Sequence, residues 1–210
     1  MKRWAIVFFL LLPTILSAQI SLGMMVGANI GKFGGVEPPD ISYTHRTGSN
    51  VGVTAIFRIT RDVSLAFQPT YSQRGSNIET GEDTRWDTLK VYQVKINFLV
   101  LPLFVRIDAD NGITYFVSGL EFALPLSAEV VFQDQSWDIS HNLSNTDILA
   151  SIGMGFRIPF GQKNHAMLEV RYYQGLVNFN YSSEEEKKRV IYENFKNSGF
   201  QIMLGIERVL

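Results

Sequence analysis

Six charged side chains occupy positions where alternating segments of the chain would turn them all to one side. They are Arg58, Arg106, Arg157, Glu169, Arg171 and Glu207. Unpaired charges in a narrow, poorly hydrated interior are costly, so groups of mixed sign should pair there. We therefore predict an ion-pair network built from these residues, joined by Arg74 and Lys95 on the same side. A gated path for protons or ions is the alternative chemistry for such a row of charges.

The chain contains three histidines, which are His45, His141 and His165. The first two fall in predicted connections at one end of the molecule and the third falls at the other, so the three cannot meet. A Ser-His-Asp site, as in a barrel-shaped lipase or acyltransferase, could combine His141 with Asp138 and with Ser140 or Ser144. Polar connections bring such triplets together by chance, and no ligands are spaced as metal-binding pairs. We expect no catalytic residue, no metal and no cofactor.

The charges share a side because their segments alternate between apolar and polar residues. In residues 166–178, AMLEVRYYQGLVN, the apolar Leu168 and Val170 alternate with Glu169 and Arg171. A period of two indicates a strand with one apolar face and one polar face. The same pattern recurs in eight segments, at 20–31, 51–60, 63–74, 89–107, 113–127, 148–160, 166–178 and 198–210.

The polar face of these segments is rich in glycine, which makes room for larger neighbours inside a narrow barrel. In the segment 89–107 the alternation changes, and we predict a β-bulge near Asn97 and Phe98 that leaves Pro102 and Arg106 facing inward. Residues 108–112, DADNG, resemble the start of a calcium loop. They lack its remaining ligands, so a turn is the better interpretation.

The first 18 residues have the layout of a cleavable export signal. Lys2 and Arg3 precede an apolar run over 4–16, and Leu16-Ser17-Ala18 leads into Gln19. We predict a signal peptide over 1–18 and a single barrel domain over 19–210. Removing Lys2 and Arg3 takes the formal net charge from -1 to -3. A slightly acidic chain offers no electrostatic basis for binding nucleic acid.

Several features together predict a barrel that crosses a membrane. No cysteine occurs, which excludes disulfides and thiolate chemistry, and no later segment approaches ~20 uninterrupted apolar residues. A membrane-bound chain of this kind would have to cross as strands. Long connections at 32–50, 75–88, 128–147 and 179–197 alternate with short ones, as in outer-membrane barrels. A secreted soluble sandwich is the alternative fold.

Residues 169–178, EVRYYQGLVN, resemble the E-x-R-Y-x-x-G-L-x-N signature of the PorT-like outer-membrane β-barrel family of Gram-negative bacteria. Residues 98–104, FLVLPLF, resemble that family's Tyr-Leu-Glu-Ile-Pro-Leu-Leu segment, and Val117-Ser118-Gly119 resembles its alanine–glycine strand. Val100 is a departure, because the family usually has glutamate there. If that glutamate pairs with an arginine of the lumen, then Arg106, Arg157 or Arg171 needs another partner in this chain.

The resemblance implies an eight-stranded barrel whose members are often labelled porins and are linked to protein secretion or surface attachment. The porin label conflicts with geometry, because about eight strands enclose an interior that side chains just fill, whereas porins need ~16.

The last long connection carries the most specific local signal. Ser183-Glu184-Glu185-Glu186 fits a capping box, and Val190, Ile191 and Phe195 form an apolar stripe. We predict a short helix over about 184–195. Its stripe either packs on the rim of the barrel or covers its mouth and docks a partner.

The sequence therefore predicts an all-β fold, an eight-stranded antiparallel transmembrane β-barrel with an up-and-down meander. We expect a monomer in the outer membrane of a Gram-negative bacterium, in contact with outer-membrane lipid and with both termini periplasmic. Its expected role is non-enzymatic, either presenting four external loops for binding or adhesion to a protein partner or assisting protein secretion. A lipid-acting barrel enzyme and a narrow channel are the alternatives.

Overall fold

The computed structural model describes residues 19–35, 37, 41–80, 90–133, 135–140, 146–178 and 195–210. The predicted signal peptide, His141, Val190 and Ile191 lie outside these residues. The described chain forms ten strands, which are β1 (Ile20–Gly34), β2 (Ile41–Arg58), β3 (Val63–Phe67), β4 (Thr70–Thr80), β5 (Lys90–Asp108), β6 (Thr114–Phe132), β7 (Gln135–Asp138), β8 (Asp147–Pro159), β9 (Asn164–Gly175) and β10 (Lys196–Val209).

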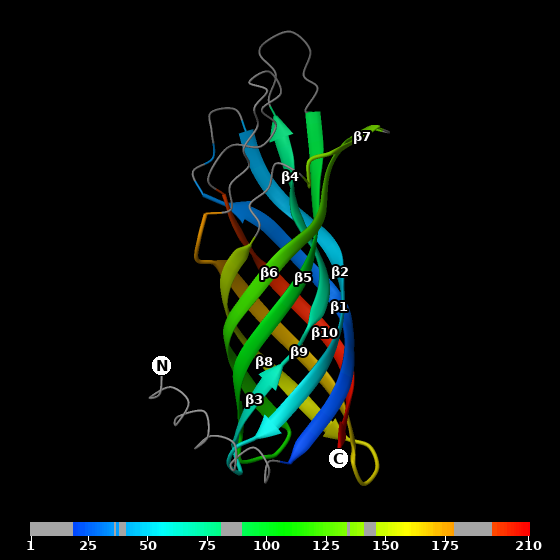
Figure 1. Ribbon diagram of the computed structural model, residues 1–210, viewed down its shortest axis with the longest axis vertical. Helices are drawn as coiled ribbons and strands as arrows, with labels where there is room; N and C mark the ends of the chain where they lie inside the picture. The colour runs from blue at the N-terminus through cyan, green and yellow to red at the C-terminus, as the bar shows by residue number, and fades with distance from the viewer. Residues whose placement is uncertain are drawn as a thin grey trace, which may run out of the picture.

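These strands close into one antiparallel barrel (Figure 1). β3 and β4 follow one another along the same wall position, between β2 and β5, and β7 pairs only with β6. Eight wall positions remain, and β1 pairs with both β2 and β10, so the ring is complete. The predicted eight-stranded meander is confirmed, and β7 is an addition that the sequence did not predict.

The two ends of the barrel differ in their connections. One end, which we call the turn end, holds the short turns at 59–62, 109–113 and 160–163 together with Gln19 and Leu210 (Figure 1). The opposite end, which we call the loop end, holds the β6–β7 hairpin and the far ends of the strands, among them Gly34, Ile41, Thr80 and Lys90. In the residues that the structure describes, no helix is long and apolar enough to cross a membrane.

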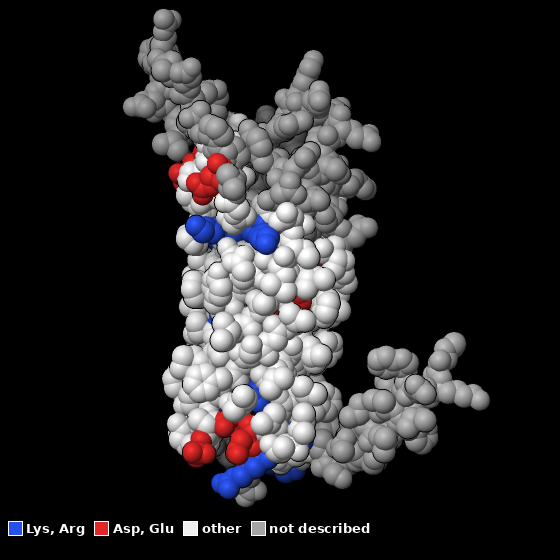
Figure 2. Space-filling view, turned by 90° about the vertical axis from the view of Figure 1, so that its left-hand side faces the viewer, with Lys and Arg blue, Asp and Glu red and all other residues white. Residues whose placement is uncertain are grey.

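A belt of exposed apolar side chains surrounds the barrel between these ends. On β5 it runs from Leu99 to Ile107, which is about the length of a tilted strand that crosses a bilayer. Aromatic rings border it, with Tyr71, Tyr172 and Phe200 towards the loop end and Phe116, Phe156 and Phe160 towards the turn end. On the face in Figure 2, the charged side chains gather near the two ends and leave the middle almost free of them.

Beyond this belt, towards the loop end, the two faces of the wall exchange their polarity. On β5 the buried inward residues become Val94, Ile96 and Phe98, while Lys95 and Asn97 face outward. The inward side chains join an apolar core, which we call the loop-end core. Its members include Phe33, Tyr43, Ile78, Val94, Ile96, Phe98, Leu149, Tyr173 and Phe195. A wall with an apolar interior and a polar exterior is typical of strands whose outer face contacts water.

Because of this exchange in polarity, the strand ends predicted from the sequence at the loop end were wrong, and several strands are longer than predicted. Residues 32–50 were expected to be a long polar connection, yet β1 continues to Gly34 and β2 begins at Ile41. The connections expected at 75–88 and 128–147 are likewise shortened, because β4 extends to Thr80 and β6 to Phe132. Outward polar residues in these stretches resemble loops in sequence, although they belong to strands that face water.

Two local predictions can be compared directly with the wall. The register between β5 and β6 shifts between Asn97 and Phe98, so the predicted bulge is confirmed. Its extra residue, however, is Leu126 of β6, and β5 keeps one parity throughout. The turn predicted at 108–112 is also confirmed, because Asn111 Oδ1 accepts hydrogen bonds from the backbone N–H groups of Ile113 and Thr114, both at 2.9 Å.

The predicted helix is wrong at the one residue of its stripe that the structure describes. Phe195 makes a strand-type bridge at the start of β10, and only 2% of it is exposed. Its ring packs on Phe33 with 4.0 Å between the centroids. Phe195 is therefore part of the loop-end core and does not belong to an exposed partner-binding stripe.

Candidate functional site

The polar interior of the barrel is divided into two ion-pair clusters. The central cluster contains Arg74 of β4, Glu121 of β6, and Glu169 and Arg171 of β9. Arg74 Nη2 lies 2.6 Å from Glu121 Oε2, and Arg171 Nε lies 2.6 Å from Glu169 Oε1. All four side chains are at most 2% exposed. Two positive and two negative charges balance within it, so each buried charge has a partner.

Aromatic rings and a hydroxyl complete the central cluster. The Arg74 guanidinium lies 4.2 Å from the ring centroid of Tyr173, and that of Arg171 lies 4.7 Å from the centroid of Phe104. Ser151 donates a hydrogen bond of 2.6 Å to Glu121 Oε1. Cation–π stacking and charge-assisted hydrogen bonds hold these side chains in one packed arrangement that fills the lumen.

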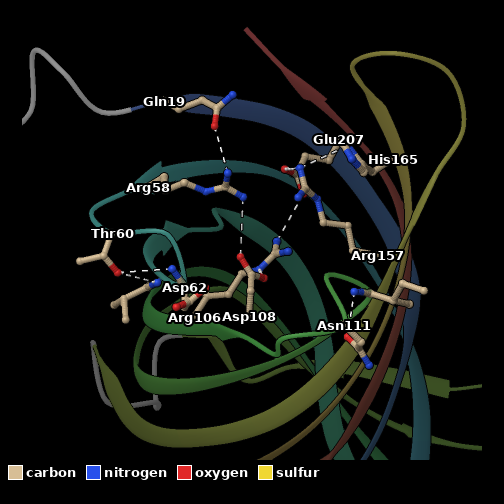
Figure 3. A network of polar contacts seen from close by, with 12 residues as sticks. Gln19, Arg58, Thr60, Asp62, Arg106, Asp108, Asn111, Arg157, His165 and Glu207 are labelled. Carbon is tan, nitrogen blue, oxygen red and sulfur yellow. Dashed lines mark hydrogen bonds and ion pairs between the residues drawn. The ribbon is translucent and has the colours of Figure 1, made fainter.

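The second cluster lies at the turn end and is seen closely in Figure 3. Arg106 donates to Asp108 Oδ1 at 2.8 Å and to Glu207 Oε2 at 3.3 Å. Arg157 donates to Glu207 Oε1 at 3.0 Å, and Arg58 lies 3.8 Å from Asp108 Oδ2. Three guanidinium groups share two carboxylates here, so this cluster retains a positive charge.

Tyr115 joins the two clusters. Its hydroxyl donates a hydrogen bond of 2.8 Å to Glu169 Oε2 in the central cluster. Its ring lies under the Arg106 guanidinium of the turn-end cluster, 3.9 Å from the centroid. Because Tyr115 is only 1% exposed, it fills the lumen between the clusters.

All six residues of the predicted network face the interior. Arg58, Arg106, Arg157 and Glu207 meet at the turn end, while Glu169 and Arg171 meet in the centre. Lys95 was expected on the same side and is not there. It faces outward near the loop end and pairs with Glu129 at 3.2 Å.

Two acids that complete the clusters were missed from the sequence, Glu121 and Asp108. Glu121 lies on β6, two strands along the wall from Arg74 on β4 and from Arg171 on β9. Arg171 Nη1 lies 3.9 Å from Glu121 Oε1. Glu121 thereby supplies the partner that the sequence analysis required in place of the glutamate absent at Val100. The sequence did contain a signal for Glu121. An acid between Leu120 and Phe122 in an alternating strand must face away from the apolar side.

The motif at 169–178 has a packing explanation. Glu169, Arg171 and Tyr173 enter the lumen clusters described above, while Tyr172 faces outward and stacks near Phe200 with 5.1 Å between the centroids. Gly175 lies where the chain of β10 passes closely, since a Cβ there would meet the backbone nitrogen of Asn197 at 3.1 Å. None of these contacts requires a ligand.

Of the two hydroxyls considered for a catalytic triad, Ser140 has a structural role, and Ser144 lies outside the described residues. Ser140 donates to Asp138 Oδ1 at 2.6 Å and accepts a hydrogen bond from the Ala128 N–H at 2.9 Å. His165 lies at the turn end, with its Nδ1 3.2 Å from Arg157 Nη2, while His45 is on β2 near the loop end. Within the described part of the chain, no three acidic, histidine or cysteine residues are grouped to hold a metal ion.

Among the described elements at the loop end, the β6–β7 hairpin projects away from the wall (Figure 1). All four residues of β7 are exposed, and Trp137 is 41% exposed. Next to it, Ile139 is buried in the loop-end core, and the Ile139 N–H donates to the Ala128 carbonyl at 2.9 Å. The hairpin is thus anchored at its base while its tryptophan stays in solvent.

The chain matches the family described as outer membrane protein beta-barrel domain over residues 17–181. It belongs to this family. As a member, it is a small β-barrel protein of the Gram-negative outer membrane, and its apolar belt contacts lipid. A search of curated protein sequences finds no match.

The chain is also similar to several solved structures. OprG of Pseudomonas aeruginosa is 12% identical, with 92% of this chain and 96% of that chain covered and a TM-score of 0.53. Neisserial surface protein A is 12% identical over 90% of this chain and 97% of that chain, with a TM-score of 0.46. Ail of Yersinia pestis is 11% identical over 90% and 99%, with a TM-score of 0.45. Such likeness concerns the fold alone.

Proposed function

We propose that this outer-membrane barrel is a non-enzymatic display protein that holds binding elements outside the cell for a protein partner. In this proposal the turn end, with both termini, faces the periplasm and the loop end faces outward, because short periplasmic turns and longer external loops are typical of such barrels. The protein acts as a monomer whose wall is a rigid support.

The anchored β6–β7 hairpin is the observation that carries the proposal. Its base is tied to the loop-end core through Ile139 and through the hydrogen bonds of Ser140, while Trp137 remains 41% exposed. Tryptophan is enriched among residues that dominate binding energy, and a preorganised element loses little entropy when it binds. An exposed tryptophan on a fixed hairpin therefore favours recognition of a partner.

The part of the wall beyond the apolar belt supports the same proposal. Beyond the apolar belt, the strands continue around the loop-end core, which includes Phe33, Ile96 and Tyr173. A barrel that served only to span lipid would have no need of this second core. It gives the displayed elements a stiff base outside the bilayer.

The packed lumen makes passage of solutes the weaker candidate. Arg74, Tyr115 and Tyr173 are each at most 1% exposed and lie across the interior. The motif at 169–178 supports a PorT-like placement within the family, which stays a proposal. With that placement, the partner would be either a component of a secretion machine or a molecule met at the cell surface.

Co-purification from native outer membrane, followed by identification of the partner, tests the proposal. We expect the native protein to retain one defined partner and Trp137→Ala to lose it. Phe160→Ala is the matched control, because this aromatic residue is 48% exposed at the opposite end of the barrel. Equal retention by Trp137→Ala and native protein would reject the hairpin as the binding element. Lipid hydrolysis by the pure protein would reject the non-enzymatic role.

A further inference from the structure

The turn-end cluster lines a narrow pocket that opens at the turn end of the barrel. Its walls carry the three guanidinium groups of Arg58, Arg106 and Arg157. Two hydroxyl groups, those of Ser21 and Ser64, also face the pocket. The lining therefore consists mainly of hydrogen-bond donors, which is the chemistry that recognises oxygen anions.

Charge in the pocket is unbalanced. Only Asp108 and Glu207 are acidic among its lining residues, against the three arginines. His165 Nδ1 lies 3.2 Å from Arg157 Nη2. An imidazole supplies no negative charge, so His165 does not offset the arginines. Because Arg106 and Glu207 are 3% and 2% exposed, water screens the excess positive charge poorly.

One donor of this set is not used within the cluster. The Arg157 side chain is 11% exposed, and its Nε is buried without a hydrogen-bond partner among the described residues. Arg58 is 37% exposed at the mouth of the pocket, where its Nη1 donates to Gln19 Oε1 at 3.1 Å and its Nη2 lies 3.8 Å from Asp108 Oδ2, which is a loose contact. At the entrance, the loosely held Arg58 guanidinium is therefore available to an anion, and Arg157 adds positive charge behind it.

We propose that the turn-end pocket is a binding site for a small oxyanion, either a phosphate or a carboxylate group. The bound anion neutralises the excess charge of the three arginines and accepts hydrogen bonds that the two carboxylates leave unused. The enclosed part of the pocket has room for about one water-sized group, so one oxygen of the anion enters it while the rest of the group, free or at the end of a longer molecule, stays at the open mouth. This site is independent of the β6–β7 hairpin and of the partner that the hairpin binds.

Titration of the purified, folded barrel in detergent micelles tests the proposal, with inorganic phosphate and acetate as separate probes. The readout is the nuclear magnetic resonance shift of the arginine Nε–Hε groups. We expect a saturable shift for Arg106 and Arg157 with at least one probe. The probe that saturates at lower concentration identifies the preferred group.

Four variants, each first checked for folding by heat-modifiable gel mobility, separate the site from general charge effects. Arg157→Gln should weaken binding about tenfold or more, because it removes a charge-assisted donor. Arg58→Gln should also weaken it and serves as a second test if Arg157→Gln does not fold. Asp108→Asn should tighten it, since it removes a competing carboxylate. Arg61→Gln, in the adjacent exposed turn and outside the pocket, is the matched control and should bind like the native protein.

Shifts that do not saturate with either probe would overturn the proposal. So would equal weakening by Arg61→Gln and Arg157→Gln, because this result would assign the effect to net charge alone. Loss of binding in Arg157→Gln with native binding in Arg61→Gln supports the site.

Discussion

Replacing Glu121 by glutamine tests the central ion-pair cluster most sharply. Glu121 Oε2 lies 2.6 Å from Arg74 Nη2, and both side chains are 1% exposed. Glutamine keeps the size of the side chain but removes its charge, which leaves the buried Arg74 guanidinium without the carboxylate it contacts. Removing one partner of a buried pair costs about 3–5 kcal/mol. We expect Glu121→Gln to lower the free energy of unfolding by that amount.

The assay is urea unfolding in lipid vesicles, followed by gel mobility and analysed by linear extrapolation. Glu129→Gln is the matched control, because it breaks the Lys95–Glu129 pair on the outer surface, where the side chains are 32% and 43% exposed. Such exposed pairs contribute about 0–1 kcal/mol. Equal losses in Glu121→Gln and Glu129→Gln, or a loss under about 1 kcal/mol in Glu121→Gln, would show that the Glu121 charge does not stabilise the barrel.

A double variant strengthens the same test. Arg74→Met combined with Glu121→Leu removes both charges and fills the space with apolar side chains. Because replacing a complete buried pair is often neutral or stabilising, this double variant should recover most of the stability that Glu121→Gln loses. Failure to recover would mean that shape, and not charge, dominates at this site.

Three further outcomes follow from the loop end and the lumen. Phe195→Ala should lower the free energy of unfolding by about 3–5 kcal/mol in the same urea assay, because it opens a cavity in the loop-end core. Gly75→Ala should cost more than about 1 kcal/mol, since Gly75 has a φ of 138° and a Cβ would meet a backbone carbonyl, while Gly112→Ala, in open space at φ 66°, should cost less. In planar bilayers the native barrel should show no discrete conductance steps, because packed side chains fill its lumen, and regular steps would contradict that.

Within the apolar belt, the side to which each residue points was predictable from the sequence, because a single face had to collect Arg106, Arg157 and Glu207 while the other met an apolar medium. Lys95, beyond the belt, was placed on the wrong side. How far each strand runs was not predictable by the same rule. At Ile96 and Phe98 the apolar side chains face inward, since the outside of the wall changes from lipid to water. Alternation alone does not tell which medium lies on each side.

Long-range pairing limited the prediction of the site in a similar way. Arg171 and Glu169 belong to one strand and one motif, so their contact was within reach of the sequence. Arg74 and Glu121 meet across 47 positions of the chain, and their pairing depends on the closure and register of the ring. Phe195 was assigned to a helix because acids before it imitate a helix start, although burial against Phe33 draws it into the wall.

β5 keeps one face outward while the medium on that face changes from lipid to water between Leu99 and Asn97. Spin labels placed one at a time at Lys95, Asn97, Leu99, Leu103 and Val105 in lipid vesicles test it through their collision rates with oxygen and with a water-soluble nickel chelate. We expect Leu99, Leu103 and Val105 to collide mainly with oxygen, as in lipid, and Lys95 and Asn97 to collide mainly with the chelate. Equal exposure of all five positions to the chelate would contradict the account.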